Sequence, residues 1–258
     1  MNIKIYYRHI NDETNSPQRP SWFTYENAFI SLFNSIKKSI YKENIDLVIS
    51  FDDSMGGVED NFISKYLNSN QLKVSAVQFT GGSQKKALQQ SLILAKKDLE
   101  KNYNKKDVYI FLENDYIYCE NWIDDLVELI NSNIKFDYFS LYDHPDKYTN
   151  LNIRDVNKNR DFRSLIFSLG CRYWRTTPGT CASFGMVSEV LKHDYKYLKY
   201  FGAFGVFNDY LFFKFMTSIM GRRILTPLPG LATHAMNEFL SPMINWNKVL
   251  VEASGDDE

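Results

Sequence analysis

The sequence predicts an α/β fold in which helices flank a central, mostly parallel sheet. Short apolar runs alternate with longer segments whose apolar residues recur at helical spacing, and this alternation is typical of βαβ units. Polar or glycine residues end each apolar run. The chain has 258 residues, of which 44% are hydrophobic and 24% are charged, so it is long enough to form one large domain.

The expected elements of the first half begin with a strand over residues 3–7. A helix over residues 25–40 follows, because apolar residues from Phe29 to Ile40 recur on one helical face. The remaining elements are expected as strand 46–51, helix 59–67, strand 74–79, helix 84–101, strand 107–112, helix 121–130 with Asn121 as its N-cap, and strand 137–142.

The alternation weakens after about residue 148, and we expect an irregular second half. Helices are predicted near residues 187–200 and 209–220. Residues 225–234 are rich in proline and glycine, which indicates an irregular segment. Residues 251–258 are expected to form a frayed acidic tail.

The bulk composition argues against nucleic acid as a partner. The formal net charge is -1 at pH 7 and the pI is about 6.4, so no basic field attracts a polyanion. The three cysteines form no CxxC pair, which is typical of a reducing compartment. No run reaches the roughly 18 apolar residues of a membrane span, and the start of the chain lacks the apolar core of a signal peptide. We therefore expect a cytoplasmic protein without a transmembrane segment.

Polar or glycine residues follow five successive predicted strands. Because ligands gather beyond the carboxyl ends of parallel strands, these residues predict a binding site at one edge of the sheet. They are Arg8-His9, Asp52-Asp53, Gly81-Gly82-Ser83, Glu113-Asn114-Asp115 and Asp143-His144.

Two carboxylates, Glu113 and Asp115, follow the strand expected at residues 107–112. Hard oxygen ligands of this kind suit Mg²⁺ or Mn²⁺, which can bridge a diphosphate; the alternative is a polar turn after a strand. His234 lies in the segment rich in turn residues. It would add a nitrogen ligand that Mn²⁺ accepts if it lay near Asp115, or it is a structural histidine.

Asp209 is expected at the start of a helix, among strongly apolar neighbours. It is either the helix cap or a general base that takes a proton from a hydroxyl group. Burial by Phe207, Tyr210 and Phe212 would raise the pKa of its carboxyl group.

Further residues have both a binding and a structural interpretation. Asp52 and Asp53 can accept hydrogen bonds from a base or ribose, or form only a loop. The segment GGSQKK, with Gly82 and Lys85, opens a helix whose amides could hold a phosphate, although it does not match the GxxxxGK(S/T) pattern of P-loop proteins. Asp143 and His144 lie in a segment dense in ligating groups, or form only a turn. Trp174, Arg175 and Thr177 could stack against and clamp a sugar or diphosphate, or form a buried aromatic with surface arginines.

The order of these segments resembles that of the GT-A glycosyltransferases, particularly the bacterial and viral family 2-like enzymes. The resemblance spans most of the chain: YYR follows the first strand, SFDDS follows the second, and FLENDY stands where the family carries its DxD-type metal motif. LYDHPDKY, WRTTPGT and GLATHAMNEFLSPMINW are similar to segments of uncharacterised family 2-like proteins. Two positions depart from the family pattern: Asn114 replaces a middle acid, and Asn208-Asp209 stands where a Glu-Asp pair is usual.

The resemblance implies a Rossmann-like GT-A fold and metal-dependent transfer of a sugar from a nucleotide-diphosphate donor to a hydroxyl acceptor such as a glycan, with inversion. It implies a single domain over residues 1–258, with the donor bound by about residues 1–147 and the acceptor by about residues 148–250, in the host cytoplasm if the source is a virus. Asp115 and His234 would hold Mn²⁺ or Mg²⁺, and Asp209 would be the base. The donor-binding residues would be Arg8, Asp52, Asp53, Gly82, Lys85, Glu113 and Asn114. The acceptor- or sugar-binding residues would be Asp143, His144, Trp174, Arg175 and Thr177.

Three other functions are alternatives to sugar transfer. A nucleotidyltransferase on a related sheet would carry a glycine-rich loop and a lysine after the first strand, and this sequence has neither. A haloacid-type phosphatase needs its DxD motif after the first strand, where this chain has Tyr7-Arg8-His9. A catalytically inactive nucleotide- or sugar-binding module on the same fold stays open, because a fold does not determine activity.

Overall fold

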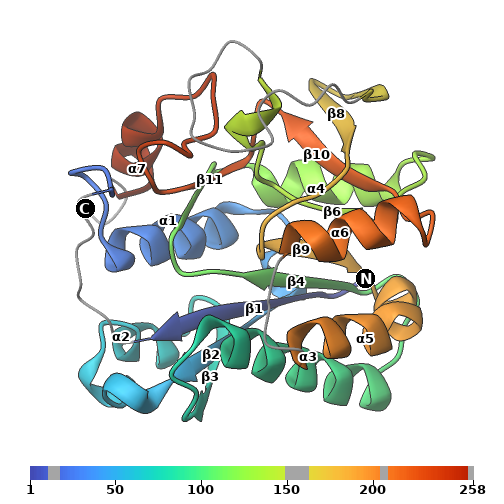
Figure 1. Ribbon diagram of the computed structural model, residues 1–258. Helices are drawn as coiled ribbons and strands as arrows, with labels where there is room; N and C mark the ends of the chain where they lie inside the picture. Colours follow the sequence, from blue (N-terminus) through green and yellow to red (C-terminus); the bar gives the residue numbers. More distant parts are fainter. Residues whose placement is uncertain (11–17, 149–162, 204–208, 255–258) are drawn as a thin grey trace.

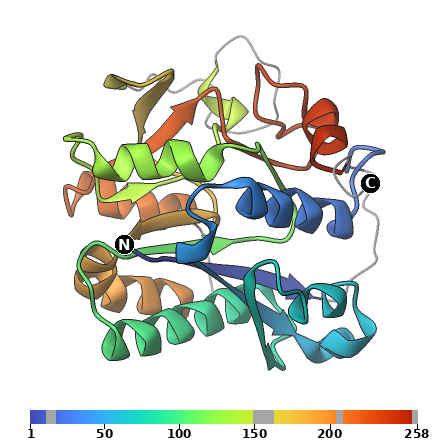
Figure 2. The ribbon, with the colours of Figure 1, turned by 180° about the vertical axis from the view of Figure 1, so that it is seen from behind.

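The computed structural model describes residues 1–10, 18–148, 163–203 and 209–254. Its helices are α1 (Tyr25–Lys38), α2 (Ser64–Leu67), α3 (Gln84–Lys101), α4 (Trp122–Asn131), α5 (Ser188–Ala203), α6 (Asp209–Ser218) and α7 (Trp246–Ser254). Short 3-10 turns lie at Lys42–Asn44, Asp53–Met55, Val58–Asp60 and Pro145–Lys147. Helices α1 and α4 cover one face of a large sheet, and α3 and α5 cover the other, as the opposite views in Figures 1 and 2 show.

The large sheet has nine strands in the order β3-β2-β1-β4-β9-β6-β10-β8-β7. Their bounds are β1 Ile3–Ile10, β2 Ile45–Asp52, β3 Lys73–Phe79, β4 Val108–Leu112, β6 Tyr138–Phe139, β7 Ile166–Leu169, β8 Arg172–Thr177, β9 Phe184–Val187 and β10 Ile224–Leu228. Only β9 and β8 run against the direction of the other strands. The prediction of a mostly parallel sheet flanked by helices is confirmed.

Alternation of side chains along β1 links the two helical layers to the sheet. Ile3, Ile5 and Tyr7 pack into the core beneath α1 and α4, whereas Tyr6 packs with residues of α3, α5 and α6. Successive side chains of a strand point to opposite faces, so a strand buried on both faces must be apolar on both. This requirement explains why β4, which reads VYIFL, is a continuous apolar run.

The second half is more regular than the sequence indicates. Within the half expected to be irregular, residues 166–177 form the antiparallel pair β7 and β8, and residues 225–234 contain most of β10 and all of β11 (Ala232–His234). Strand β9 lies between β4 and β6, so the sheet takes neighbouring strands from both halves of the chain. These strands pair with distant partners, and a local apolar pattern does not reveal such pairing.

Three predicted boundaries of the first half need correction. The first strand, expected over residues 3–7, runs to Ile10, so Arg8 and His9 lie within it and not after it. The strand expected over residues 137–142 is only Tyr138–Phe139, and the helix expected over residues 59–67 is a 3-10 turn followed by the short helix α2. Asn121 precedes α4 as predicted, but its side chain does not cap the helix; its amide Nδ2 donates to Asp125 Oδ2 at 3.1 Å instead. The side-chain amide of Asn121 is therefore bonded to Asp125 and does not cap the helix.

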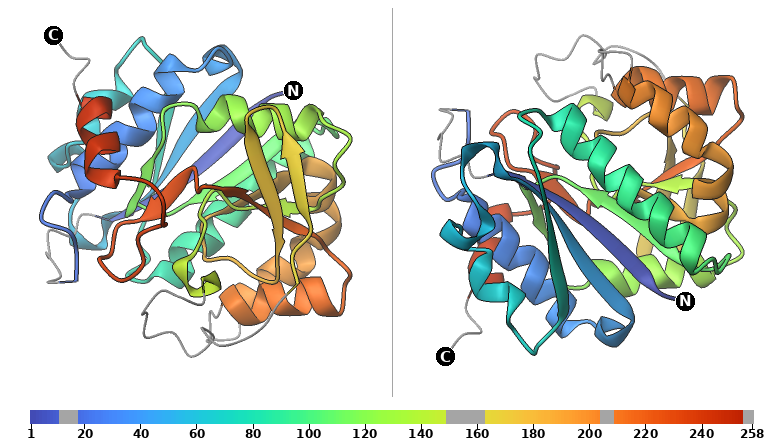
Figure 3. Two further views of the ribbon diagram at one scale, coloured as in Figure 1. Left: turned by 90° about the horizontal axis from the view of Figure 1, so that it is seen from above. Right: turned by 90° about the horizontal axis from the view of Figure 1, so that it is seen from below.

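The end of the chain packs on the α1 side of the sheet. Helix α7 lies beside α1 (Figure 3), and Trp246 and Leu250 share a cluster with Ala28. Residues 251–254 of the expected acidic tail thus belong to a helix, while residues 255–258 lie outside the described residues. Within the described part of the chain, no helix is long and apolar enough to cross a membrane.

Candidate functional site

A pocket of about 250 Å³ opens where β1, β2 and β4 end and α3 begins. Six residues that the sequence predicted to be functional line it together with seven others. The lining residues are Arg8, His9, Ile10, Arg19, Tyr25, Asp52, Gly82, Ser83, Gln84, Ala87, Glu113, Asn114 and Asp115.

Strand register explains why residues far apart in sequence meet here. In the parallel sheet, Tyr7 of β1 lies beside Leu112 of β4, where β4 ends. Glu113 therefore leaves the sheet beside Arg8, which still pairs with β2. Arg8 Nη2 lies 3.5 Å from Glu113 Oε1 and donates to the carbonyl oxygen of Ala182 at 3.0 Å. Arg8 is 5% exposed, and its Nη1 has no hydrogen-bond partner. A buried guanidinium therefore keeps a free donor at the site.

The second, two-stranded sheet places His234 against Asp115. After Asp115 the chain forms β5 (Tyr116–Tyr118), which pairs antiparallel with β11 so that His234 stands opposite Tyr116. His234 Nε2 lies 2.9 Å from Asp115 Oδ2, and Arg19 Nη2 lies 2.8 Å from the same oxygen. The expected irregular segment around His234 is thus a strand, and the strand pairing brings these residues together.

Asp115 is the most strongly perturbed carboxylate of the site. Burial favours its neutral form, but the charges and hydrogen bonds of His234 and Arg19 hold its pKa well below the usual range. For His234, burial likewise favours the neutral form, and Asp115 overrides it and raises the pKa of the imidazole. Burial raises the pKa of Glu113 to about 6, an effect that Arg8 opposes and the charge of Asp115 reinforces. Asp115 is therefore ionised at neutral pH.

Asp115 and His234 could supply one carboxylate and one imidazole to a divalent cation. Asp115 Oδ1 is buried and has no hydrogen-bond partner, and an imidazole nitrogen lies beside the same carboxylate. Among the residues that the structure describes, no group of three or more His, Cys, Asp and Glu side chains could hold a metal ion. Mg²⁺ sites commonly use one or two carboxylates plus substrate phosphates and water, and this set has that character.

Asp209, the predicted base, is the first residue of α6 and does not line the pocket. It lies within electrostatic reach of Glu113, because its charge contributes to the raised pKa of that carboxyl group. Burial raises the pKa of Asp209 itself, and hydrogen bonds from backbone amides and the charge of His144 partly oppose this effect. Its Oδ1 accepts from the amide of Tyr210 at 2.7 Å. Phe207, expected to contribute to its burial, and Asn208 lie outside the described residues.

Asp52 and Asp53, adjacent in sequence, have different surroundings. Asp52 is 2% exposed and accepts from the amides of Gly81 at 3.0 Å, Gly82 at 2.6 Å and Ser54 at 3.1 Å. Burial alone would raise the pKa of Asp52, but these hydrogen bonds lower it. Asp53 is half-buried, accepts from Thr80 Oγ1 at 2.7 Å and does not line the pocket.

Asp52 fixes the loop that opens α3. Gly82 has a φ of 70°, which L side chains rarely adopt, so glycine allows its amide to turn toward Asp52. Ser83 then caps α3, with its side chain accepting from the amide of Lys86. Lys85, a predicted donor-binding residue, is half-buried on this first turn and does not line the pocket.

The residues predicted to bind acceptor or sugar do not line the pocket. Trp174 has no exposed surface, and the hydroxyl of Thr177 donates to the carbonyl oxygen of Gly179 at 2.8 Å. His144 accepts from the amide of Asp146 at 3.1 Å and caps the 3-10 turn that follows. Asp143 and Arg175 form a buried ion pair, and Asp143 also accepts from the hydroxyl of Tyr148.

Seven pocket residues were not among the predicted site residues, and His9, Arg19 and Tyr25 are three of them. Burial lowers the pKa of His9 to about 3, and its Nε2 has no hydrogen-bond partner. The sequence placed His9 near the end of the first strand, but it was not predicted to be a site residue. Arg19 follows an aperiodic polar segment, and no sequence signal links it to Asp115.

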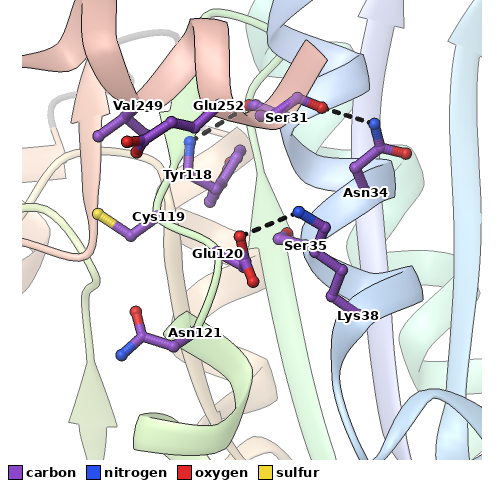
Figure 4. A pocket seen from close by; sticks show the side chains of 11 residues that line it. Ser31, Asn34, Ser35, Lys38, Tyr118, Cys119, Glu120, Asn121, Val249 and Glu252 are labelled. Atoms are coloured by element: carbon purple, nitrogen blue, oxygen red, sulfur yellow. Dashed lines mark hydrogen bonds and ion pairs between the residues drawn. The ribbon is translucent and has the colours of Figure 1, made fainter. Parts of the chain in front are cut away.

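A second cavity, also of about 250 Å³, lies between α1, the β5–α4 connection and α7 (Figure 4). Polar groups on its wall pair with one another: Lys38 Nζ lies 3.0 Å from Glu120 Oε2, and Asn34 Nδ2 donates to the carbonyl oxygen of Ala253 at 2.7 Å. None of the predicted functional residues lines it. The pocket at the strand ends is therefore the candidate functional site.

Comparison with known proteins gives structural matches only. No family model and no curated protein sequence matches this chain. The mannosyltransferase PcManGT from Pyrobaculum calidifontis, in complex with GDP-Man and Mn2+, matches with a TM-score of 0.51 and 10% identity, over 88% of this chain and 54% of that chain. The bifunctional IspDF from Campylobacter jejuni matches with a TM-score of 0.41 and 13% identity, over 88% of this chain and 49% of that chain.

This chain spans about half the length of each of these two proteins. At 10% identity the likeness to the mannosyltransferase shows the fold alone. The chain has a GT-A type fold, as its sequence resemblance implied.

Proposed function

We propose that this protein transfers a sugar from a nucleotide-diphosphate donor to a hydroxyl acceptor with the help of a divalent cation. One observation carries the proposal. Asp115, which lines a pocket of about 250 Å³, is in contact with His234, and the second oxygen of Asp115 has no hydrogen-bond partner. The GT-A type fold supports the same conclusion, because ligands of such sheets bind beyond the strand ends.

In this proposal the pocket binds the nucleoside diphosphate. Arg8 supplies a buried guanidinium with a free Nη1, which suits a phosphate oxygen. The loop that Asp52 holds opens the 18-residue helix α3, and amides at a helix start favour anions. Glu113 and Asn114 line the wall between this helix and Asp115. Phosphate charge would therefore meet positive groups on both sides of the pocket.

Asp115 and His234 would hold Mn²⁺ or Mg²⁺ at the diphosphate end. When bound, such an ion neutralises charge that develops on the departing nucleoside diphosphate. Asp115 is suited to this role because it is ionised, and because its Oδ1 is buried without a partner. An unpaired buried carboxylate oxygen costs free energy, which a cation would recover.

Asp209 is the proposed general base. Its carboxylate accepts the proton of the acceptor hydroxyl, while the hydroxyl oxygen forms a bond to the anomeric carbon of the sugar. The bond from that carbon to the phosphate oxygen breaks, and its electron pair leaves with the nucleoside diphosphate. Attack opposite the leaving group inverts the anomeric centre. Burial raises the pKa of Asp209, which makes it a stronger base than an exposed aspartate.

Thermal unfolding with a panel of nucleoside diphosphates, with and without Mn²⁺, tests the donor site. Ligands of the folded state raise the unfolding midpoint by mass action. We expect one nucleotide to raise it only with Mn²⁺, and Asp115→Ala to abolish the rise. Asp53→Ala is the control, because Asp53 directly follows β2 but does not line the pocket. No shift with any nucleotide would contradict the proposal.

Hydrolysis of the donor distinguishes a transferase from the alternative, an inactive binding module. A transferase slowly releases nucleoside diphosphate from its donor sugar with Mn²⁺ when water replaces the acceptor. An inactive module gives the same thermal shift without this release. The fold is compatible with both, because function depends on the site and not on the sheet.

A further inference from the structure

Arg19 occupies the carboxylate that the proposed cation needs. Its Nη2 lies 2.8 Å from Asp115 Oδ2, and its Nη1 donates to the carbonyl oxygen of Ala235 at 3.0 Å. The guanidinium also stands over the rings of Phe23, at 4.8 Å, and Tyr25, at 6.0 Å. Only 14% of the Arg19 side chain and 12% of the Asp115 side chain are exposed. Water therefore screens this ion pair only weakly.

A divalent cation at Asp115 and a guanidinium on the same carboxylate oppose each other. Two like charges a few Å apart repel by several kcal/mol at an effective dielectric constant of about 20. His234 Nε2 shares the oxygen that Arg19 uses, so a cation held by both residues would approach the guanidinium closely. Arg19 must weaken or leave its contact with Asp115 for that cation to bind well.

The pocket offers Arg19 a second anion when the donor is present. Arg19 lines the same pocket as Arg8, and a planar guanidinium matches phosphate oxygens as well as carboxylate oxygens. The bond to the Ala235 carbonyl and the two aromatic rings fix the direction of the side chain, not the identity of its anionic partner. A rotation of the guanidinium is enough to exchange that partner.

We propose that Arg19 is a positioning residue that neutralises Asp115 while the site is empty and moves to the donor diphosphate when the cation binds. The inference rests on the proposed function. Its consequence is positive coupling: the cation displaces Arg19 from Asp115, the displaced guanidinium binds the diphosphate, and each ligand strengthens binding of the other.

Cation binding without nucleotide tests the first half of this inference. Free Mn²⁺ is measured by electron paramagnetic resonance in titrations of wild type, Arg19→Gln and Arg172→Gln. Arg172 is a matched control, because its Nη2 lies 2.8 Å from Asp125 Oδ2 and the two side chains are 16% and 11% exposed. We expect Arg19→Gln to bind Mn²⁺ about tenfold more tightly than wild type, within the usual range of coupling between sites. Arg172→Gln should match wild type.

Nucleotide binding tests the second half. With saturating Mn²⁺, the nucleoside diphosphates GDP and UDP are titrated by calorimetry, and the tighter ligand should bind Arg19→Gln about tenfold more weakly than wild type. Arg19→Lys keeps the charge but lacks the planar fork, so it should bind Mn²⁺ as wild type does and the nucleotide more weakly. Opposite changes in cation and nucleotide affinity in Arg19→Gln are the signature of partner exchange; a purely structural role does not give them.

The results separate the two proposals. Mn²⁺ binding that is unchanged or weaker in Arg19→Gln overturns the role of Arg19, whatever nucleotides do. Failure of every protein, wild type included, to bind any nucleotide overturns the proposed function, even if Mn²⁺ binds Arg19→Gln more tightly. Thermal melting checks that each variant is folded. If Arg19→Gln is not, unchanged nucleotide affinity in Arg19→Lys overturns the inference.

Discussion

The charged residues at the ends of β1, β2 and β4 are arranged differently from those of the strand β8. At the ends of β1, β2 and β4, charged residues converge on a pocket, and Asp115 keeps a buried oxygen without a partner. In β8, Arg175 points into the protein and pairs with Asp143, which has no exposed surface. The carboxyl ends of neighbouring parallel strands meet at one edge of the sheet, whereas Arg175 lies within a strand, where successive side chains point to opposite faces. The first arrangement collects groups for a ligand, and the second distributes them through the fold.

This difference predicts that charge removal affects activity in one region and stability in the other. The largest effect is expected for Asp209→Asn, which removes the proposed base. Release of nucleoside diphosphate from the donor should fall about 10³-fold, within the usual range for loss of a general base. The unfolding free energy should not fall, because the asparagine oxygen can accept the hydrogen bond from the amide of Tyr210. A rate loss of less than about tenfold would show that Asp209 is only a helix cap.

The next effect is expected for Arg175→Met. The substitution leaves the Asp143 carboxylate buried beside the hydroxyl of Tyr148 without its cation. Removing one partner of a buried ion pair costs about 3–5 kcal/mol, and denaturant unfolding should show this loss. The double variant Asp143→Asn/Arg175→Met should recover part of it. A loss below about 1 kcal/mol, as for exposed pairs, would mean that this pair is not structural.

His9 lines the pocket, and we expect it to make the unfolding free energy depend on pH. Its pKa is about 3 in the folded protein and near its ordinary value of 6.5 in the unfolded chain, so below pH 6.5 the unfolded state binds a proton that the folded state excludes. Stability is therefore lost as the pH falls from about 6.5 toward 3. Between pH 7 and pH 5, wild type should lose about 2 kcal/mol more unfolding free energy than His9→Phe. Equal losses would show that His9 is protonated in the folded state.

The position of the pocket could be predicted because it follows from local sequence patterns. Apolar runs marked β1, β2, β3 and β4, and the parallel arrangement implies that residues after these strands meet at one edge. Asp52 shows the limit of this argument. The sequence placed it at the pocket, but its carboxylate is occupied by the amides of Gly81, Gly82 and Ser54, so it fixes a loop. Position along a strand predicts where a carboxylate lies and not what it contacts.

The rest depended on pairing between distant segments. β8 reads RYWRTT, and neither its alternation nor its pairing with β10 is visible in those letters. Trp174 has no exposed surface because this strand turns it into the core. The contact of Arg19 was even harder to predict, because its partner Asp115 lies 96 residues away and no periodicity links them. Contacts of this kind are set by tertiary structure.

The contact between His234 and Asp115 joins residues 119 positions apart through the pairing of β11 with β5. Closing so long a loop costs chain entropy and slows the formation of the contact, since local turns and helices can form first. The contact between His234 and Asp115 therefore does not exist in a chain in which only the N-terminal strands have folded. Until β11 docks, Asp115 lacks its imidazole neighbour, so assembly of the site and completion of the fold are a single event.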